Sequence, residues 1–586
     1  MPLHCLRENR AAPNSLTRIR PPTYHPLVQP VISSASMREV DRLTVERFGT
    51  PSLMLMESAA GAAYDAIGAR LGSELDGKVA CILCGPGNNG GDGAALARKL
   101  SQAGVRCDVI LFSRIDNTKG DARINFETTQ KLAAFASGSK VRPSGLSFVE
   151  CDTLVVWEEL ARPRRTYDII VDALFGTGLT HPLEGLFRQV VEHVALLRRA
   201  RERNRAERPL IVSLDVPSGL DADRAELIGE TIRADLTITF TAPKPANVLA
   251  PAFHHGGELV VGNIGSPRTL VEAMPAEVLL VDREDAREWL VRTRYSPDSY
   301  KNSHGHALVI AGSRGFTGAA VLCASAAMRA GAGLVTIATP LSAQATIASL
   351  AMPEIMTAAL AETDRGAVSD EAIEHTLKLA SRVNVIAIGP GLSAEDERTR
   401  AYVQAIIERR RTPVVVDADG LNAIAPWPKG LQGSTDHPLI LTPHPGEMLR
   451  LMGANDKSAL GDRVSAVRTF ATAHNVIVVL KGGRTLIAAP DGRVFVNPTG
   501  NAGLGTAGSG DTLTGLITGF LAQEYGNGAN REQALPLNAV IAALYVGGLA
   551  GDLAAHAIGM RAMVASDIRD YFSAAIRLLD PDGEAP

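Results

Sequence analysis

Two series of short apolar runs, separated by helical stretches, constrain this chain more than any other feature. The runs of the first series cover residues 79–83, 107–112, 168–175, 209–216 and 236–240. Those of the second series cover residues 306–312, 333–340, 384–391, 413–420, 438–444 and 475–483. Continuous apolar runs between helices indicate strands that are buried on both faces of a parallel sheet. The sequence therefore predicts an α/β fold with two parallel sheets.

The two series do not align with each other as a repeat, so they predict two different domains. Between them the periodicity weakens, and residues 281–303 are polar and interrupted by Pro297. A chain of 586 residues is also too long for a single core. We expect the first domain over residues 31–270 and the second over residues 280–582. Residues 1–30 hold Arg and Pro but no apolar segment, which predicts a disordered extension and no secretion signal.

Composition excludes several classes of protein. The net charge of −4, with both signs interspersed, gives no sign of a nucleic-acid-binding surface. No run approaches ~18 uninterrupted apolar residues, so no membrane-spanning helix is predicted. Most of the six cysteines lie in or beside apolar runs, as buried thiols in a reducing compartment do. Cys81 and Cys84 form a C-x-x-C without a second pair, which does not indicate zinc. We expect a cytoplasmic homo-oligomer that acts on small molecules, without nucleic acid or membrane.

The first glycine-rich turn, CGPGNNGGDG at residues 84–93, fits the dinucleotide-binding pattern G-x-G-x-x-G from Gly85 onward. In a Rossmann unit such glycines let backbone N–H groups approach a pyrophosphate, and an acidic residue ending the second strand binds the ribose. Here the second strand ends in Ser113. The missing acid argues against a plain dehydrogenase. A tight turn with Asp92 as the cap of the following helix is the alternative interpretation.

Two further strands of the first series end in oxygen-bearing side chains. Asp172 ends one strand, and Asp215 ends another, with Ser218 three residues later. Loops at the carboxyl ends of adjacent parallel strands converge on one crevice. Asn89, Asp172 and Ser218 would therefore supply hard oxygen ligands for a monovalent cation, together with backbone carbonyls. Either Asp alone is typical of a turn or a cap, but three such loops together predict a site.

These three motifs, CGPGNNGGDG (84–93), DALFGTGL (172–179) and DVPSGLDAD (215–223), resemble those of NAD(P)HX epimerase domains, over roughly residues 35–265. Such domains interconvert the two epimers of NAD(P)H that has been hydrated at its nicotinamide ring. The resemblance implies that the turn binds a damaged dinucleotide as substrate, and that Asn89, Asp172 and Ser218 hold K+. It implies a catalytic Asp215, in contact with the substrate near its reacting carbon. The implied substrate contacts, in the turn and in a loop that runs to Pro182, are Asn88, Asn89, Gly90, Gly91, Asp92, Gly176, Thr177, Gly178 and Leu179.

A single carboxylate suits this chemistry. A carbon that bears a hydroxyl beside a ring nitrogen can lose water to give an iminium ion, then regain water on the other face. One group must protonate the leaving hydroxyl and deprotonate the entering water, which one Asp can do at a suitable pKa. Lys244, in FTAPKPAN after the last strand, is a candidate helper, with a surface lysine as the alternative.

The most informative stretch of the second half is NPTGNAGLGTAGSGDTLTGLITGF, at residues 497–520. It runs through Gly508, Ser509, Gly510 and Asp511 into an apolar helix that we expect to begin at Thr512. Backbone N–H groups at a helix N-terminus form an anion hole that can stabilise a transferring phosphoryl group. Asp511 lies where a base must accept a proton from an attacking hydroxyl. A capping Asp after a flexible loop is the alternative.

This element resembles the G-[AS]-G-D motif of the ribokinase-like fold, and the second half resembles NAD(P)HX dehydratase domains over roughly residues 285–580. The supporting motifs are HGHALVIAGSRGFTGAA (304–320), AIGPGLS (387–393), VVDADGLN (415–422), LTPHPGEM (441–448) and LKGGRT (480–485). The two resemblances imply a Rossmann-like three-layer first domain and a ribokinase-like α/β second domain.

The second resemblance implies that ADP or ATP, with Mg2+, drives dehydration of the S epimer of NADHX or NADPHX. Asp511 would deprotonate the ring hydroxyl while the anion hole and Mg2+ stabilise the phosphoryl group, which then leaves as phosphate. Asp417 and Asp419 would organise Mg2+ through water, or form an ordinary turn. The implied hydrate contacts are Ala319, Gly391, His444 and Asp511. The implied nucleotide contacts are Lys481, Gly482, Gly483, Arg484, Thr485 and Gly510.

The sequence therefore predicts an enzyme that repairs hydrated NADH and NADPH by epimerisation and by nucleotide-dependent dehydration, with ADP giving AMP and phosphate. One alternative is a ribokinase-like kinase of sugars or vitamin precursors with an N-terminal dinucleotide-sensing domain. A second alternative makes the first half a sensing module without an activity of its own.

Overall fold

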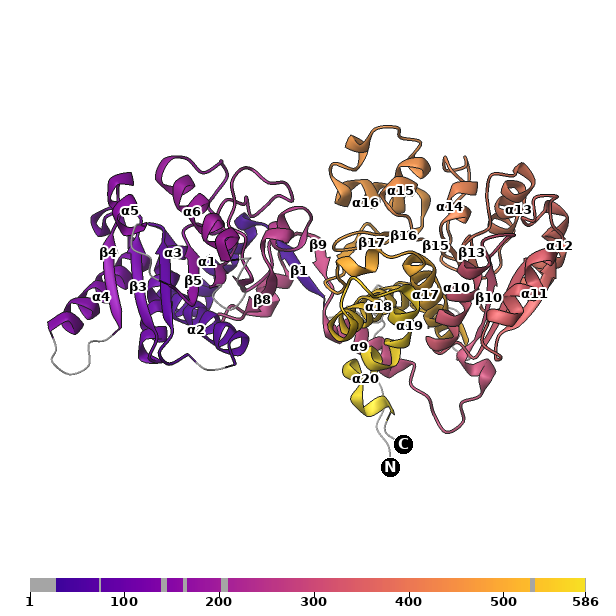
Figure 1. The fold of residues 1–586 in the computed structure, drawn as a ribbon, viewed down its shortest axis with the longest axis horizontal. Coiled ribbons are helices and arrows are strands. Elements are labelled where there is room, and N and C mark those ends of the chain that lie inside the picture. The colour runs from indigo at the N-terminus through magenta and orange to yellow at the C-terminus, as the bar shows by residue number, and fades with distance from the viewer. Residues whose placement is uncertain are drawn as a thin grey trace, which may run out of the picture.

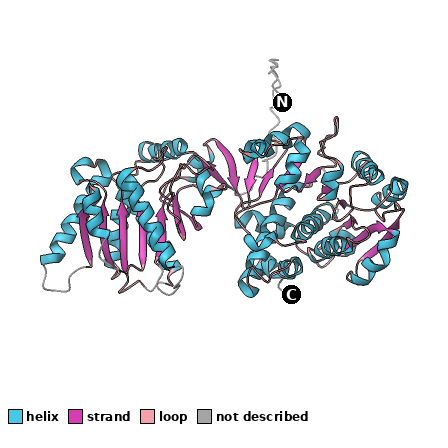
Figure 2. Ribbon diagram, turned by 45° about the horizontal axis from the view of Figure 1, so that its top comes forward, coloured by secondary structure: helices cyan, strands magenta, loops and turns pink. Residues whose placement is uncertain are grey.

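The structure is a computed structural model and describes residues 28–72, 75–138, 145–161, 166–201, 209–526 and 533–584. The extension predicted over residues 1–30 lies almost wholly outside the described residues. The chain forms two α/β bodies, each with a sheet between layers of helices (Figures 1 and 2).

The first sheet has seven strands, all paired in parallel, in the order β4-β3-β2-β5-β6-β7-β8. The strands are β2 (Val79–Cys84), β3 (Arg106–Leu111), β4 (Leu146–Glu150), β5 (Ile169–Ala173), β6 (Leu210–Leu214), β7 (Leu236–Phe240) and β8 (Glu258–Gly262). Five of them are the predicted apolar runs, and β4 and β8 add the two edges. The strand order reverses beside β2, where loops open a crevice in sheets of this kind.

Helices cover both faces of this sheet, so the first domain has the predicted three layers. The core cluster on one face holds residues of α2, α3 and α4, and the cluster on the other holds residues of α5 and α6. The helices are α1 (Ser34–Phe48), α2 (Ser52–Arg70), α3 (Asn88–Gln102), α4 (Gly120–Gly138), α5 (Leu154–Ala161), α6 (Gly185–Arg201), α7 (Pro245–Val248) and α8 (Arg268–Glu272).

The second sheet has eleven strands, in the order β1-β9-β18-β17-β16-β15-β14-β13-β10-β11-β12. From β12 to β16 every pairing is parallel, whereas β17 is antiparallel to both of its neighbours. The strands that follow the first domain are β9 (Ala276–Leu280), β10 (His306–Ile310), β11 (Leu334–Pro340), β12 (Met356–Leu360), β13 (Val385–Ile388), β14 (Val414–Val416), β15 (Leu439–Leu441), β16 (Ile477–Leu480), β17 (Leu486–Ala488) and β18 (Val494–Val496).

Helices also cover both faces of the second sheet. The core cluster on one face holds residues of α9, α10, α17 and α18, and the cluster on the other holds residues of α13, α15 and α16. The helices are α9 (Arg283–Arg292), α10 (Thr317–Arg329), α11 (Leu341–Leu350), α12 (Ile373–Ala380), α13 (Glu397–Glu408), α14 (Asp419–Ala423), α15 (Pro445–Met452), α16 (Arg463–His474), α17 (Ser509–Gly526), α18 (Pro536–Ile558), α19 (Ala565–Asp570) and α20 (Phe572–Leu579).

The two ends of the first domain are both tied to the second sheet. Strand β1 (Gln29–Ile32), which precedes the first domain, pairs antiparallel with β9, which follows it, and β9 pairs in parallel with β18. Figure 1 shows β1 and β9 side by side between the two bodies. Val31 and Val278 belong to a core cluster of the second domain. No sequence pattern pointed to this pairing.

The polar segment that follows β9 forms helix α9 of the second domain. Its Trp289 stacks on Phe520, with the ring centroids 4.1 Å apart, and donates from Nε1 to Glu524 at 2.9 Å. One buried tryptophan therefore fixes a helix whose other residues are mostly charged.

Helix α18 is the one helix among the described residues that is long and apolar enough to cross a membrane. It packs against α9, α17 and α20, and 61% of its most apolar window is buried inside the protein. Core helices of soluble proteins pass the same test, so α18 is weak evidence for a membrane span.

Candidate active sites

The glycine-rich turn after β2 packs directly on the loop after β5. A Cβ on Gly85 would lie 1.9 Å from the carbonyl oxygen of Leu174, and a Cβ on Gly90 would lie 1.9 Å from that of Gly85. Helix α3 begins at Asn88, and its N-cap, Gly87, makes no side-chain capping bond. Asp92 lies inside the helix, so the interpretation of Asp92 as the cap is wrong.

The loops after β2, β5 and β6 converge, as the sequence predicted. Asp172 is 1% exposed and accepts hydrogen bonds from Ser218 Oγ at 2.6 Å, Ser218 N at 2.9 Å and Ser213 Oγ at 2.8 Å. Burial raises the pKa of Asp172, and these hydrogen bonds oppose the rise. A Cβ on Gly176 would lie 2.9 Å from Asp215 Oδ2 and 3.5 Å from Asn89 Cγ. Side chains from the loops after β2 and β6 therefore meet over Gly176 of the loop after β5.

Asp215 pairs with Lys244 in this crevice. The Nζ of Lys244 donates to Asp215 Oδ1 at 2.5 Å, to Thr239 Oγ1 at 2.9 Å and to the carbonyl of Phe240 at 3.1 Å. Lys244 is 1% exposed, so it is not the surface lysine of the alternative interpretation. Asp215 itself has a φ of 65°, in the left-handed region that residues other than glycine seldom adopt.

In the second domain Asp511 lies in the first turn of α17. This helix begins at Ser509, so the predicted start at Thr512 is three residues too late. Burial raises the pKa of Asp511 to about 7, the charge of Asp417 adds to the rise, and Lys481 opposes it. A carboxyl group with this pKa can act as a base near neutral pH.

A lysine–aspartate pair lies beside Asp511. Asp417, which is 1% exposed, accepts from Lys481 Nζ at 2.7 Å and from Thr514 Oγ1 at 2.8 Å. A Cβ on Gly510 would lie 3.4 Å from Lys481 Nζ and 3.7 Å from Asp417 Oδ2. The ends of β14 and β16 therefore meet the start of α17.

The residues implied as contacts of the hydrated substrate, other than Asp511, lie in two different parts of the domain. A Cβ on Gly391 would lie 3.1 Å from the Cβ of Ala319, so these two are neighbours. His444 is the N-cap of α15: its Nδ1 accepts from Gly446 N at 2.9 Å, and its Nε2 lies 3.5 Å from Glu447 Oε1. The other oxygen of Glu447 lies 3.9 Å from Lys481 Nζ, which links His444 to the Lys481–Asp417 pair.

Comparison with known proteins identifies both halves. A family model described as NAD(P)H-hydrate dehydratase matches residues 307–573, and one described as YjeF-related protein N-terminus matches residues 52–246. The bifunctional NAD(P)H-hydrate repair enzyme Nnr of Moorella thermoacetica is 38% identical over 556 residues, 94% of this chain and 98% of that protein. Its namesake in Thermofilum pendens is 36% identical over 94% of this chain and 97% of that protein. The chain belongs to the family of bifunctional NAD(P)H-hydrate repair enzymes.

Membership of this repair family confirms the predicted enzyme, with an epimerase domain followed by a ribokinase-like dehydratase domain. The kinase and sensing-module alternatives are not supported. Among solved structures, an ADP/ATP-dependent NAD(P)H-hydrate dehydratase from Bacillus subtilis, co-crystallised with ATP/Mg2+, is 29% identical with a TM-score of 0.43. The match covers 51% of this chain and 98% of the Bacillus subtilis chain.

One residue near Asp215 and Lys244 was missed by the sequence analysis. Asp41 Oδ1 is buried without a hydrogen-bond partner. Burial raises the pKa of Asp41 to about 6, Lys244 opposes the rise and Asp215 adds to it, which places Asp41 within range of both charges. Burial likewise raises the pKa of Asp92, with Asp215 and Asp41 adding to it. In sequence, Asp41 is an ordinary polar position of an amphipathic helix and carries no signal.

The predicted K+ ligands of the repair enzyme have the chemistry that the ion requires. Both amide atoms of Asn89 are buried without a partner, and Asp172 and Ser218 add carboxylate and hydroxyl oxygens.

The implied substrate contacts of this domain differ in their surroundings. Gly91 lies against helix α4, because a Cβ there would lie 2.8 Å from the Cα of Ala122. Thr177, Gly178 and Leu179 continue the loop from Gly176 and are half-buried to exposed.

Metal and thiol chemistry have little support elsewhere. In the part of the chain that the structure describes, no three His, Cys, Asp or Glu side chains converge as metal ligands. The five cysteines of that part, including Cys81 and Cys84, are buried and free. Asp417 is engaged by Lys481, and Asp419 accepts from Ser393 N at 2.9 Å.

Proposed function

We propose that the first domain equilibrates the R and S epimers of NADHX and NADPHX at Asp215, and that the second dehydrates the S epimer at Asp511 with the help of a nucleotide. The observation that carries the proposal is the carboxyl group of Asp511, whose pKa lies at about 7, in the first turn of α17. This position places a base next to the backbone N–H groups of a helix N-terminus.

In the epimerase crevice, Asp215 protonates the leaving hydroxyl and then deprotonates the water that enters from the other face. Its pairing with Lys244 Nζ at 2.5 Å fixes the orientation of the carboxylate. Asp41, with its pKa raised to about 6, is a second group that can hold a proton close to neutral pH. The glycine turn from Gly85 to Gly90 leaves the start of α3 open to the phosphates of the dinucleotide.

Asn89, Asp172 and Ser218 would hold K+ in this crevice. Bound there, the ion would add a positive charge next to the phosphates and fix the three loops. The unpartnered amide of Asn89 supports this assignment, since a buried amide without a partner is unfavourable.

In the dehydratase site, Asp511 accepts the proton of the ring hydroxyl as it attacks the terminal phosphoryl group of the nucleotide. The N–H groups from Gly508 to Gly510 and the ammonium of Lys481 stabilise the developing negative charge. The ring nitrogen then expels phosphate, which leaves more readily than hydroxide. Mg2+ bound to the nucleotide would supply further charge stabilisation, held through water near Asp417 and Asp419.

The decisive experiment incubates the full chain with hydrated NADH, Mg2+ and either ADP or ATP, and follows recovery of NADH absorbance. We expect recovery from both epimers, with ADP converted to AMP and phosphate. A kinase would instead phosphorylate an added vitamin precursor or sugar. Absence of NADH recovery with both nucleotides would contradict the proposal.

We also propose a cytoplasmic, homo-oligomeric protein. The buried free thiols support a reducing compartment, and analytical ultracentrifugation tests the assembly, since a monomer at micromolar concentration would contradict it.

A further inference from the structure

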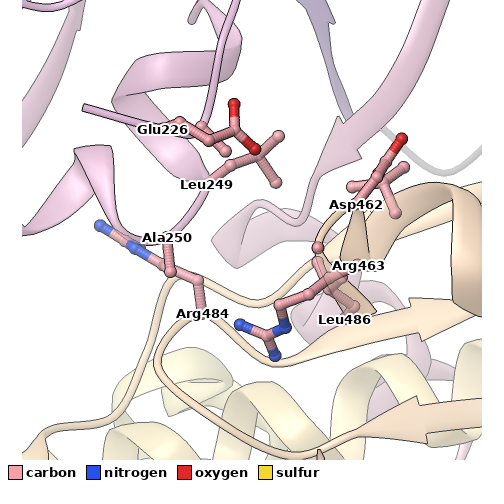
Figure 3. Close-up of a pocket in the computed structure, with 10 residues that line it drawn as sticks. Glu226, Leu249, Ala250, Asp462, Arg463, Arg484 and Leu486 are labelled. Atoms are coloured by element: carbon pink, nitrogen blue, oxygen red, sulfur yellow. The ribbon is translucent and has the colours of Figure 1, made fainter. Parts of the chain in front are cut away.

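A small pocket lies at the junction of the two domains (Figure 3). The centres of water-sized groups can occupy about 40 Å³ in it. A space of this size admits a phosphate-sized oxyanion. The lining residues that matter here are Glu226 and Ala250 of the first domain and Asp462, Arg463 and Arg484 of the second.

Two arginines of the pocket have nitrogens without partners. The Nε and Nη2 atoms of Arg463, at the start of α16, are buried and make no hydrogen bond, and the same holds for Nε of Arg484. Arg484 does donate from Nη1 to the carbonyl of Pro498 at 2.7 Å, and its Cζ lies 5.0 Å from the ring centroid of Phe253. Arg484 is therefore held in place with one donor left over, and Arg463 has two donors left over.

Carboxylates do little to compensate the charge of these two groups. Burial lowers the pKa of Arg463, with no carboxylate to oppose it. Burial lowers the pKa of Arg484 as well, opposed only by Asp552. A buried cation without an anion is unfavourable, and a guanidinium group matches the oxygens of a phosphate in geometry and charge.

The acidic residues of the pocket do not fill this role. In Figure 3 the carboxylates of Glu226 and Asp462 lie on the opposite side of the pocket from the two guanidinium groups. Asp462 caps α16 by accepting from Ser465 N at 3.0 Å. The guanidinium groups of Arg463 and Arg484 are therefore not paired with these two carboxylates.

The pocket lies next to the loop implied in nucleotide binding, on a different side from the dehydratase centre. A Cβ on Gly482 would lie 3.0 Å from Arg463 Nη2, and a Cβ on Gly483 would lie 3.4 Å from Phe253 Cζ of the first domain. Lys481, by contrast, points to Asp417. An anion at Arg463 would thus contact the loop without occupying the position beside Asp511.

We propose that Arg463 and Arg484 form a binding site for a phosphate-type oxyanion at the domain junction. The oxyanion is either a phosphate group of the nucleotide that the loop carries or free inorganic phosphate. The existence of the site does not rest on the proposed function, whereas the choice of the nucleotide and of free phosphate as the two sources of the oxyanion does. Since residues of both domains line the pocket, occupancy would hold the first domain against the nucleotide loop.

The test titrates the full chain with inorganic phosphate in a calorimeter, for wild type, Arg463→Met and Arg484→Met. Arg365→Met is the matched control, because Arg365 is an exposed arginine far from the pocket in sequence. Phosphate also suits the anion hole of α17, so we expect two sites in wild type and in the control. We expect each pocket variant to lose one of them, by roughly tenfold or more in affinity. Equal phosphate binding by all four proteins would overturn the proposal.

A titration with ADP distinguishes the two sources. If the oxyanion belongs to the nucleotide, Arg463→Met raises the KM for ADP, and ADP displaces phosphate from the Arg463-dependent site. If it is free phosphate, that site stays open in the ADP-saturated protein, and the KM for ADP does not change. Normal phosphate binding without NADH recovery would contradict the proposed function alone.

Folding of the variants is checked by thermal unfolding without phosphate. Methionine removes an unpaired buried charge and keeps most of the side-chain volume, so we expect the melting temperature to equal or exceed that of wild type. Should Arg463→Met unfold, Arg463→Lys keeps the charge and loses the planar fork. We then expect the phosphate affinity of Arg463→Lys to lie between those of wild type and Arg484→Met. A wild-type affinity in both Arg463→Lys and Arg484→Met would overturn the site.

Discussion

At the scale of single residues, each candidate site contains a carboxyl group that the fold has placed among other polar or charged groups. Burial and the charge of Asp417 bring the pKa of Asp511 to about 7, so that its basic form is present at neutral pH. Asp172 is buried too, but it accepts hydrogen bonds from Ser213 and Ser218, which oppose the rise in its pKa. The same residue type therefore has different surroundings in the two places.

We expect Asp511→Asn to abolish nucleotide-dependent dehydration, with a rate loss of ~10²–10⁴-fold, because the amide cannot accept the proton. Epimerisation should stay at the wild-type rate, since Asp511 belongs to the other domain. NADH recovery measures the first activity, and NMR of the two epimers measures the second. Dehydration near the wild-type rate would remove Asp511 from the mechanism.

The dehydration rate should also follow the protonation state of Asp511. Its raised pKa means that the carboxyl group is protonated, and inactive as a base, below pH of about 7. We expect the rate to fall as the pH falls through this value and to level off above it. The control is thermal unfolding of the same protein over the same pH range, which shows that the fold is kept. A dehydration rate unchanged between pH 5.5 and 8 would contradict the role of Asp511.

Asp172→Ala tests the proposed K+ site, because it removes the one full negative charge among Asn89, Asp172 and Ser218. We expect epimerisation to slow strongly while dehydration of the S epimer stays close to wild type. The measurement is epimer exchange by NMR in K+ and in a large organic cation, for both proteins. Equal rates in all four samples would mean that Asp172 is only a turn residue.

At the scale of elements, the crevice of the epimerase domain depends on how closely the turn before α3 approaches its neighbours. Gly85 and Gly90 have no room for a Cβ, because backbone oxygens lie 1.9 Å from its position. Gly87, two residues away, has nothing within 4 Å of that position and a φ of −94°. The glycines of one motif therefore have different reasons to be present.

We expect Gly90→Ala to disrupt this turn, at a cost of about 1–3 kcal/mol or more in the stability of the first domain, since backbone atoms must move. Epimerisation should be lost with it. Gly87→Ala is the matched control and should keep both the fold and most of the activity. Thermal unfolding and epimer exchange measure the two effects. Equal behaviour of the two variants would contradict the importance of close packing at Gly90.

At the scale of the whole molecule, the two domains are not simply joined end to end. Strand β1 precedes the epimerase domain in sequence but belongs to the sheet of the dehydratase domain, through β9. An unpaired strand edge exposes backbone N–H and C=O groups, and this pairing covers the edge of β9. The chain therefore enters and leaves the first domain at one place.

A fragment that ends at residue 275 tests how independent the first domain is. It contains β2 to β8 with their helices, so we expect it to fold and to equilibrate the two epimers. The complementary fragment from residue 276 onward lacks β1, and we expect it to unfold at a lower temperature than the same domain in the full chain. If neither fragment is soluble, the two domains form one folding unit.

Much of this arrangement could be predicted from local sequence. Strands β2, β3, β5, β6 and β7 are continuous apolar runs, which is how strands buried on both faces appear in a sequence. The motifs around Asn89, Asp172 and Asp215 lie at strand ends, and strand ends meet at one edge of a parallel sheet. By contrast, β17 and β18 were not predicted, because they are antiparallel strands joined by turns and do not fit a pattern of apolar runs separated by helices.

The sequence by itself determined the two parallel α/β layers and the repair family, and it proposed the residues of both centres, because these depend on apolar patterning and on motifs that are contiguous in the chain. Only the tertiary structure decided that β1 pairs with β9, that Asp41 joins Asp215 and Lys244, and that Arg463 and Arg484 line one pocket. In each of these cases the partners are far apart in sequence, and each residue alone is an ordinary polar or edge-strand position. The proposed roles of such residues rest on their burial and on their missing hydrogen-bond partners, and both are properties of the folded chain.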